Sequence, residues 1–332
     1  MLQFLDKPEI DRLVKSAFPT GNTSWKQMEK GLLNQNILVC ADQQSYLLKV
    51  YRPELTSQDL VEMHRVLEFV KGEGIPVPEL ISYQETDRVR IAMYTFLPGK
   101  HPSMYSRSKT RISVMGDMLG RVHTALERYQ EKYSVPQPTL DPVMPTADKK
   151  LKKIEAMCQD IRETKPPKYK ALLRVLGETA ERLQSRVWDI HAFDHLPRHL
   201  CHGDFHTKNI LFSGNVLTGV IDWEKFGWGG HAFEIMRSII YNCRRSASSL
   251  DWASVDAYIQ AYRRHQHLTP IECELAFPFV FQKLMFGTWA EEQYVKGQHE
   301  LWDNVERRRA MNAYLFENEQ QFSERIANLL SR

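Results

Sequence analysis

The sequence has few cysteines, almost no excess of charge of one sign, and no long apolar run. Its five cysteines stand singly, without a Cys-x-x-Cys spacing, which argues against a disulfide framework or a zinc site. The 44 basic and 41 acidic residues leave a formal charge of +3, too little to indicate a nucleic-acid or membrane surface. Even the apolar stretch 276–290 is interrupted by Gln282 and Lys283, so no window predicts a membrane-spanning helix.

The N-terminal residues, MLQFLDKPEIDRLVKS, mix acidic and basic side chains with short apolar stretches. They lack the uninterrupted apolar region of a signal peptide. Together with the scattered cysteines, this favours a cytoplasmic protein that binds neither nucleic acid nor membrane. The sequence assigns no oligomeric state.

The length of the chain predicts two lobes, because 332 residues exceed the size at which a single hydrophobic core usually stops growing. Residues 10–18 have the pattern of an amphipathic helix, and residues 25–40 and 45–50 that of a hairpin with its turn at 41–44. A helix follows that begins after Thr56 or Ser57. Further expected strands are 80–82 and 89–96, before Pro98-Gly99 breaks the pattern.

Helical periodicity dominates from Arg111 onward. Residues 151–164 and 169–188 predict two amphipathic helices, and everything beyond Phe233 is expected to be helical. One short β segment interrupts them, with a turn at 213–215. The fold class predicted is therefore α+β, with a small β-rich lobe at residues 1–97 and a larger, mainly helical lobe at residues 98–332.

The chemistry is indicated by the segment Cys201-His202-Gly203-Asp204-Phe205-His206-Thr207-Lys208-Asn209. In phosphoryl transfer of the kinase type, one carboxylate meets the acceptor hydroxyl and a nearby amide oxygen binds a metal on the phosphate chain. Asp204 and Asn209 suit these two functions. The β-hairpin that follows returns the chain to Asp222, so Asn209 and Asp222 are expected at the same end, where their hard oxygen atoms suit Mg²⁺.

The segments HGDFHTKNIL and LTGVIDWE resemble those of the aminoglycoside phosphotransferase and choline kinase family, relatives of the eukaryotic protein kinases. The resemblance covers most of residues 25–240. It implies a two-lobed, protein-kinase-like fold with ATP between the lobes and Mg²⁺ on the phosphates. It also implies that Asp204 is the catalytic base or hydroxyl-orienting group, that His202 supports the loop, and that Asn209 and Asp222 bind the metal.

Nucleotide-binding residues follow from the same resemblance. Lys49, in the run Leu47-Leu48-Lys49-Val50-Tyr51, matches the strand lysine that contacts the α and β phosphates. Its expected partner is a glutamate on the next helix, either Glu62 or Glu68, with Glu62 preferred.

Two further segments would contact the nucleotide. Gly31 and Asn34 lie in the expected phosphate-covering turn. Met93, Tyr94 and Phe96 lie in the segment that resembles the adenine-binding hinge.

One departure from the family pattern is Glu234, which stands where the family has a structural aspartate. The acceptor also stays open, because members of the family phosphorylate amino sugars, sugars, amino alcohols and hydroxy amino acids. The run Lys49-Val50-Tyr51-Arg52-Pro53-Glu54 also resembles bacterial kinases of this fold that act on protein serine or threonine. A pseudokinase that works as an interaction protein is a third hypothesis, although Asp204, Asn209 and Asp222 are all present.

Overall fold

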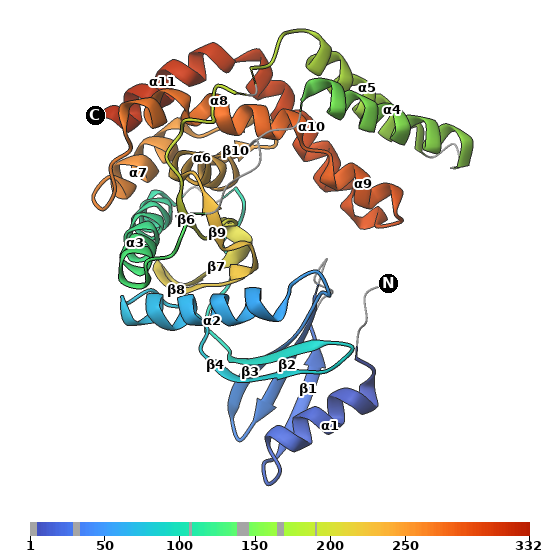
Figure 1. Cartoon of the computed structure of the whole chain (residues 1–332), viewed down its shortest axis with the longest axis vertical. Helices are drawn as coiled ribbons and strands as arrows, with labels where there is room; N and C mark the ends of the chain where they lie inside the picture. Colours follow the sequence, from blue (N-terminus) through green and yellow to red (C-terminus); the bar gives the residue numbers. More distant parts are fainter. Residues whose placement is uncertain (1–4, 29–33, 106–107, 138–145, 165–168, 190) are drawn as a thin grey trace. The chain divides into compact units, whose positions relative to one another are not determined.

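The computed structural model describes residues 5–28, 34–105, 108–137, 146–164, 169–189 and 191–332 (Figure 1). The chain forms two compact units, each assembled from separate segments. Unit 1 comprises residues 1–102, 124–134 and 202–227, and unit 2 comprises residues 103–123, 135–201 and 228–332. The lobe boundary predicted between residues 97 and 98 stays a prediction, and these units divide the chain differently because a later segment joins unit 1.

A five-stranded antiparallel sheet forms the base of unit 1, with the strand order β1-β2-β3-β5-β4. The strands are β1 (Thr23–Gln27), β2 (Gln35–Ala41), β3 (Gln44–Tyr51), β4 (Leu80–Glu85) and β5 (Arg90–Thr95). The turn expected at 41–44 joins β2 to β3, with positive φ angles at Asp42 and Gln43. A left-handed backbone at both central positions matches the twist of a tight hairpin.

One face of this sheet packs against helix α1 (Lys7–Ala17). Alternate strand residues such as Val39, Leu48 and Met93 form a buried cluster with Ile10 and Val14 of the helix. Burial of each such side chain contributes about 1.5–3 kcal/mol. Because side chains alternate across a strand, the residues between them, Lys49 included, point to the opposite face.

Helix α2 (Ser57–Gly72) covers the face that carries Lys49. It begins as the sequence predicts, with Thr56 and Asp59 forming a reciprocal capping box. His64 Nε2 lies 2.6 Å from the hydroxyl of Tyr94, a residue of that face. Burial lowers the pKa of His64 to about 4, so its imidazole is neutral at pH 7.

A later hairpin, β7 (Ile210–Ser213) and β8 (Val216–Val220), belongs to unit 1 although it follows the unit 2 segments 103–123 and 135–201. Backbone hydrogen bonds attach it there: Val220 donates to the carbonyl of Pro76, and Lys100 and Phe212 donate to each other. The last turns of α3 (Lys109–Tyr133) also belong to this unit. These attachments bring the His-Gly-Asp segment into the same compact unit as the sheet.

Unit 2 is mainly helical, with α8 (Pro270–Phe286) packed against α6 (His231–Asn242) and α11 (Glu319–Ser331). Its other helices and strands are α4 (Ala147–Thr164), α5 (Lys170–Gln184), β6 (His199–Cys201), β9 (Gly227–Gly229), β10 (Arg244–Ser246), β11 (Ser249–Leu250), α7 (Trp252–Tyr262), α9 (Trp289–Val295) and α10 (Trp302–Glu317). The small hairpin β10–β11 corrects the expectation that everything beyond Phe233 is helical. Its pairing is short and irregular, so it leaves no clear alternation in the sequence.

The five cysteines are all free thiols. Burial raises the pKa of Cys201 and of Cys243, so neither thiol is reactive at neutral pH. Over the ranges that the structure describes, no helix is both long enough and apolar enough to cross a membrane.

Candidate active site

The ends of the β7–β8 hairpin bring Asn209 and Asp222 together. Ile210 pairs with Val220, and the backbone N–H of Ile221 donates to the carbonyl of Asn209 at 2.9 Å. Asp222 has a left-handed backbone, with φ of 64°, which aspartate tolerates better than most residues. Two residues that are 13 positions apart therefore lie at one end of a single hairpin.

The carboxylate of Asp204 is held by two nitrogen atoms. His206 Nε2 lies 3.1 Å from Oδ1, and Lys225 Nζ lies 2.8 Å from Oδ2. His206 Nδ1 accepts from the backbone N–H of Lys208, so the ring proton sits on Nε2 and points at the carboxylate. With one oxygen held from each side, Asp204 has a defined orientation and stabilised negative charge.

His202 connects this loop to the hairpin. Its Nδ1 accepts from the backbone N–H of Asp204 at 3.1 Å, and its Nε2 then donates to the carbonyl of Ile221 at 3.1 Å. The side chain is fully buried. Gly203 is also required, because a Cβ at its positive φ would lie 2.1 Å from the carbonyl oxygen of Lys225. These two bonds join the loop to the hairpin, and the supporting role that the resemblance implies for His202 stays a prediction.

Lys49 reaches this end of the hairpin from β3. Its Nζ lies 2.9 Å from Oδ1 of Asp222 and also pairs with Glu224. Burial lowers the pKa of Lys49, but the two carboxylates raise it by more, so the net shift is upward. Burial likewise opposes the charge of Asp222, and the attraction of Lys49 outweighs it, so the pKa of Asp222 is lowered. Lys49 and Asp222 are therefore both charged at neutral pH.

The expected pair between Lys49 and Glu62 is replaced in the structure by the pair with Glu224. Glu62 instead accepts a hydrogen bond from the hydroxyl of Tyr129, at 2.6 Å, and lies near Arg65. The resemblance suggested a glutamate on α2, but the ammonium of Lys49 pairs with Asp222 and Glu224, which follow β8. We therefore assign Glu224, and neither Glu62 nor Glu68, as the structural partner of Lys49.

Asn34 takes part in the same network. Its Nδ2 donates to Glu224 at 2.6 Å, and its Oδ1 accepts from the backbone N–H of Arg52 at 3.0 Å. Each end of the amide thus has one partner within the protein, and the predicted contact with phosphate stays a prediction. Gly31, the other residue predicted for this turn, lies outside the described residues.

The three residues predicted for the hinge have different surroundings. Met93 lies in the core against α1, so its side chain is on the face of the sheet opposite Lys49. Tyr94 is buried on the same face as Lys49, and its hydroxyl lies 2.5 Å from that of Tyr51. Phe96, beyond the end of β5, is 39% exposed and stays a predicted contact for an adenine ring.

The oxygen atoms at the end of the hairpin fit Mg²⁺ in kind. Asn209 donates through Nδ2 to the carbonyl of Asp204 at 2.9 Å, which leaves its amide oxygen for another partner. Asp222 uses Oδ1 for Lys49, and its side chain is 42% exposed. Carboxylate and amide oxygens are the ligands that Mg²⁺ prefers, with phosphate oxygens filling further positions.

Two residues of this site were missed by reasoning from the sequence. Glu224 and Lys225 lie two and three positions after Asp222, within the quoted segment LTGVIDWE and one residue beyond it. Both belong to a short 3₁₀ turn, Trp223–Lys225, which points one side chain at Lys49 and the other at Asp204. A charged pair in the turn after Asp222 was the available signal.

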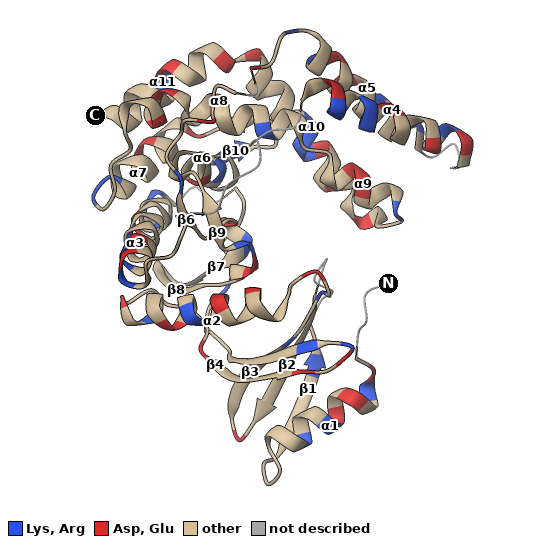
Figure 2. Cartoon of the chain, viewed as in Figure 1, with Lys and Arg blue, Asp and Glu red and all other residues tan. Residues whose placement is uncertain are grey.

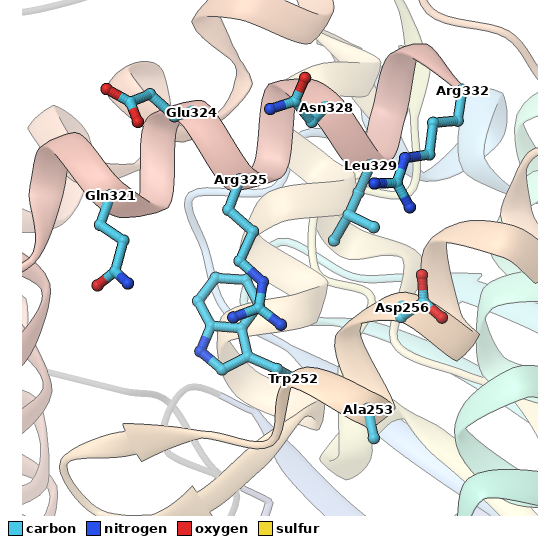
Figure 3. A pocket seen from close by; sticks show the side chains of 9 residues that line it. All are labelled: Trp252, Ala253, Asp256, Gln321, Glu324, Arg325, Asn328, Leu329 and Arg332. Carbon is cyan, nitrogen blue, oxygen red and sulfur yellow. The ribbon is translucent and has the colours of Figure 1, made fainter.

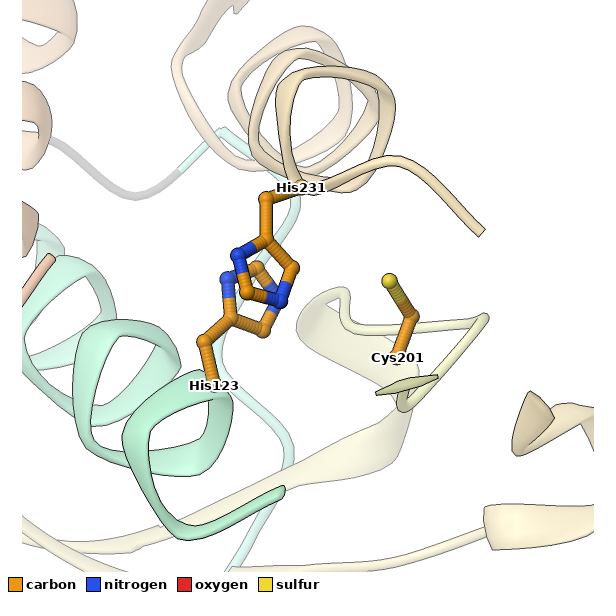
Figure 4. A group of neighbouring side chains, drawn as sticks. All are labelled: His123, Cys201 and His231. Carbon is orange, nitrogen blue, oxygen red and sulfur yellow. The ribbon is translucent and has the colours of Figure 1, made fainter. Parts of the chain in front are cut away.

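A second cluster, His123, Cys201 and His231, brings three potential metal ligands together in unit 2 (Figure 4). The rings of His123 and His231 are stacked 3.7 Å apart and almost parallel, at 5°. A metal ion binds an imidazole nitrogen in the plane of the ring, and parallel planes share no point. His123 also bonds to Tyr262 and, at 2.9 Å, to Glu234. The cluster is therefore structural, with Glu234 in the buried structural position expected for it.

A hollow of about 640 Å³ lies between α7 and α11 in unit 2 (Figure 3). The guanidinium of Arg325 lies over the ring of Trp252, 4.0 Å from its centroid. Acidic and basic side chains alternate around it, and it contains none of the predicted catalytic residues. It gives no indication of a reaction.

A β-rich unit with a strand lysine and a loop aspartate, joined to a mainly helical region, defines a protein-kinase-like phosphotransferase. Residues 24–268 match the phosphotransferase enzyme family, which is most of the chain, and the protein belongs to that family. It is a kinase.

Similar proteins support the same class. A homoserine kinase of Zymomonas mobilis is 23% identical over 208 residues, which are 60% of this chain and 59% of that enzyme. The chain thus spans less than two thirds of this relative. Among solved structures, a microcompartment-associated aminopropanol kinase has a TM-score of 0.61 at 13% identity, covering 95% of this chain and 98% of the other. An aminoglycoside phosphotransferase with ADP and hygromycin B has a TM-score of 0.52 at 15% identity, covering 96% and 98%.

Proposed function

We propose that this protein transfers the γ-phosphoryl group of ATP to a hydroxyl group of an amino sugar, a sugar, an amino alcohol or a hydroxy amino acid. The observation that carries the proposal is the fixed carboxylate of Asp204, held by His206 and Lys225. It belongs to the same compact unit as the Lys49–Asp222 pair. A positioned base beside a cation and metal-binding oxygens is what phosphoryl transfer requires.

In the proposed reaction, Asp204 orients the acceptor hydroxyl and accepts its proton as the bond from oxygen to the γ-phosphorus forms. The bond between that phosphorus and the bridging β-oxygen breaks, ADP leaves, and the proton passes from Asp204 to solvent. Lys49 stabilises negative charge on the phosphates. Mg²⁺, when bound by Asn209 and Asp222, would neutralise charge on the phosphate chain.

A hydroxy amino acid is the first acceptor to test, because the curated relatives are named homoserine kinases and homoserine is a hydroxy amino acid. ATP as the donor is supported by the family neighbour solved with ADP. The assay measures ADP release with a panel of amino sugars, amino alcohols, hydroxy amino acids and a generic protein substrate. Turnover of the protein substrate alone would favour the serine/threonine kinase alternative.

The Asp204→Asn variant tests the role of the carboxylate. It keeps the size of the side chain but removes the base, so kcat should fall by about 10²–10⁴-fold. The Kd for ATP, measured by calorimetry with Mg²⁺, should stay within about twofold because Asp204 does not bind the nucleotide. Turnover close to that of the wild type would refute the assignment. Absence of turnover in the wild type with every acceptor would favour the pseudokinase alternative.

A further inference from the structure

Arg244, the first residue of β10, is a buried cation whose charge is not balanced. Only 7% of the residue is exposed. Its Nε donates to the carbonyl of Ile240 at 2.8 Å. Within the described part of the chain, no carboxylate lies at ion-pair distance from Arg244, and its two terminal nitrogens have no hydrogen-bond acceptor. A buried charge without a counter-ion is costly.

Two other arginines of unit 2 lie close to Arg244 or to the aromatic ring that it contacts. Arg237 of α6 and Arg244 both approach the ring of Tyr241, with guanidinium carbons 5.2 and 5.3 Å from its centroid. Arg307 of α10 is close enough for its charge to oppose that of Arg244. Burial lowers the pKa of Arg244 and the charge of Arg307 adds to this, while Tyr241 and Tyr105 act in the opposite direction.

These positions come from four parts of unit 2. Figure 2 shows basic residues on α6, β10 and α10, and Tyr105 lies in the segment before α3. Arg307 also has no carboxylate partner among the described residues, and its Nη2 donates to Asn304 at 2.6 Å. Arg307 and the ring of Tyr241 therefore lie beside one buried guanidinium, whose two terminal nitrogens keep free donors among the described residues.

We propose that Arg244, together with Arg307 and the platform of Tyr241, binds the oxyanion of a small ligand, a carboxylate or a phosphate group. The guanidinium is planar and offers two parallel N–H donors, which match two oxygens of such a group. An anion there would supply the missing counter-charge for both arginines. The site contains no residue of the proposed catalytic machinery.

The site is tested by thermal unfolding of the wild type, Arg244→Met and Arg245→Met in rising concentrations of inorganic phosphate or of acetate. Chloride keeps the ionic strength constant. Arg245 is the matched control because it is the next residue of β10 and is exposed. A bound anion raises Tm with a saturating dependence. The wild type and Arg245→Met should show this rise, and Arg244→Met should bind at least about tenfold more weakly.

Phosphate can also bind where nucleotide phosphates bind, and that binding would raise the Tm of both variants. The test of the Arg244 site is therefore the difference in Tm response between Arg244→Met and Arg245→Met. Equal responses of these two variants, or no response of the wild type to either anion, would overturn the proposal. Arg244→Met should fold, because methionine replaces an unbalanced buried charge with an apolar chain of similar length. Should it fail to fold, Arg307→Met gives the same test at a partly exposed position, with a several-fold weaker response expected.

Kinetics then identify the source of the anion, an assignment that rests on the proposed function. If the anion belongs to the acceptor, Arg244→Met should raise KM about tenfold for a hydroxy amino acid. It should leave KM unchanged for ATP and for the amino alcohol that lacks the carboxylate. If a separate ligand binds, all three KM values stay unchanged while the phosphate response is lost. Absence of turnover in the wild type would refute the kinase proposal alone, since the unfolding experiment still decides the anion site.

Discussion

The pairing of Lys49 with Glu224 can be measured as an interaction free energy. The Lys49→Met variant removes the ammonium, and Glu224→Gln removes the negative charge but keeps an oxygen that can accept from Asn34. The exposed fractions of the two side chains are only 11% and 7%, so solvent screens their attraction weakly. Because Lys49 also pairs with Asp222, loss of Glu224 leaves the ammonium partly satisfied.

The expected coupling between Lys49 and Glu224 is about 2–3 kcal/mol. This coupling is smaller than the cost of breaking an isolated buried ion pair, which is roughly 3–5 kcal/mol. It falls within the range of about 1.5–3 kcal/mol for hydrogen bonds to charged groups. Urea unfolding of the wild type, both single variants and the double variant gives this coupling as a double-mutant cycle. If the two units unfold separately, the transition that shifts in Lys49→Met is the one to use.

The control is the same cycle with Glu62→Gln, which tests the partner that the sequence suggested. Glu62 bonds to Tyr129 instead, so its coupling to Lys49 should be close to zero. A coupling below about 0.5 kcal/mol for Glu224, within the usual error of additivity, would refute the assignment. An equal coupling for Glu62 would also do so, because it would mean that the pair seen here is not the one that stabilises the fold.

Two further predictions concern the catalytic loop and unit 2. Replacing Lys225 with Met removes a positive charge 2.8 Å from Asp204. The acid limb of the kcat/KM profile should therefore move to higher pH, by an amount that solvent screening keeps small because Lys225 is half exposed. Lys225→Arg should restore the limb, and superimposed profiles for Lys225→Met and wild type would contradict the role. In α3, a Cβ at Gly116 would lie 2.2 Å from the carbonyl oxygen of Tyr258, so Gly116→Ala should lower the free energy of unfolding by about 1–3 kcal/mol. Gly177→Ala, in α5 with open space around it, should raise it by about 0.5–1 kcal/mol, and shifts of the same sign in urea unfolding would count against this reasoning.

Local sequence determined most of the elements and the candidate catalytic segment of this protein. The turn at 41–44, the start of α2 at Thr56 and the β7–β8 hairpin depend on residues close together in the chain, and their patterns were readable. The same holds for Asn209 and Asp222, because a short hairpin with a tight turn brings its two ends together whatever surrounds it.

Tertiary structure alone decided the partners of the charged groups. Lys49 and Glu224 are 175 residues apart, and which of several glutamates meets the ammonium depends on how the hairpin docks onto the sheet. The side of the sheet that Met93 faces, and the burial of Arg244 among other cations, were decided in the same way. Periodicity encodes which residues are buried within an element, but the attraction between two charges depends on a distance that exists only after the elements have packed.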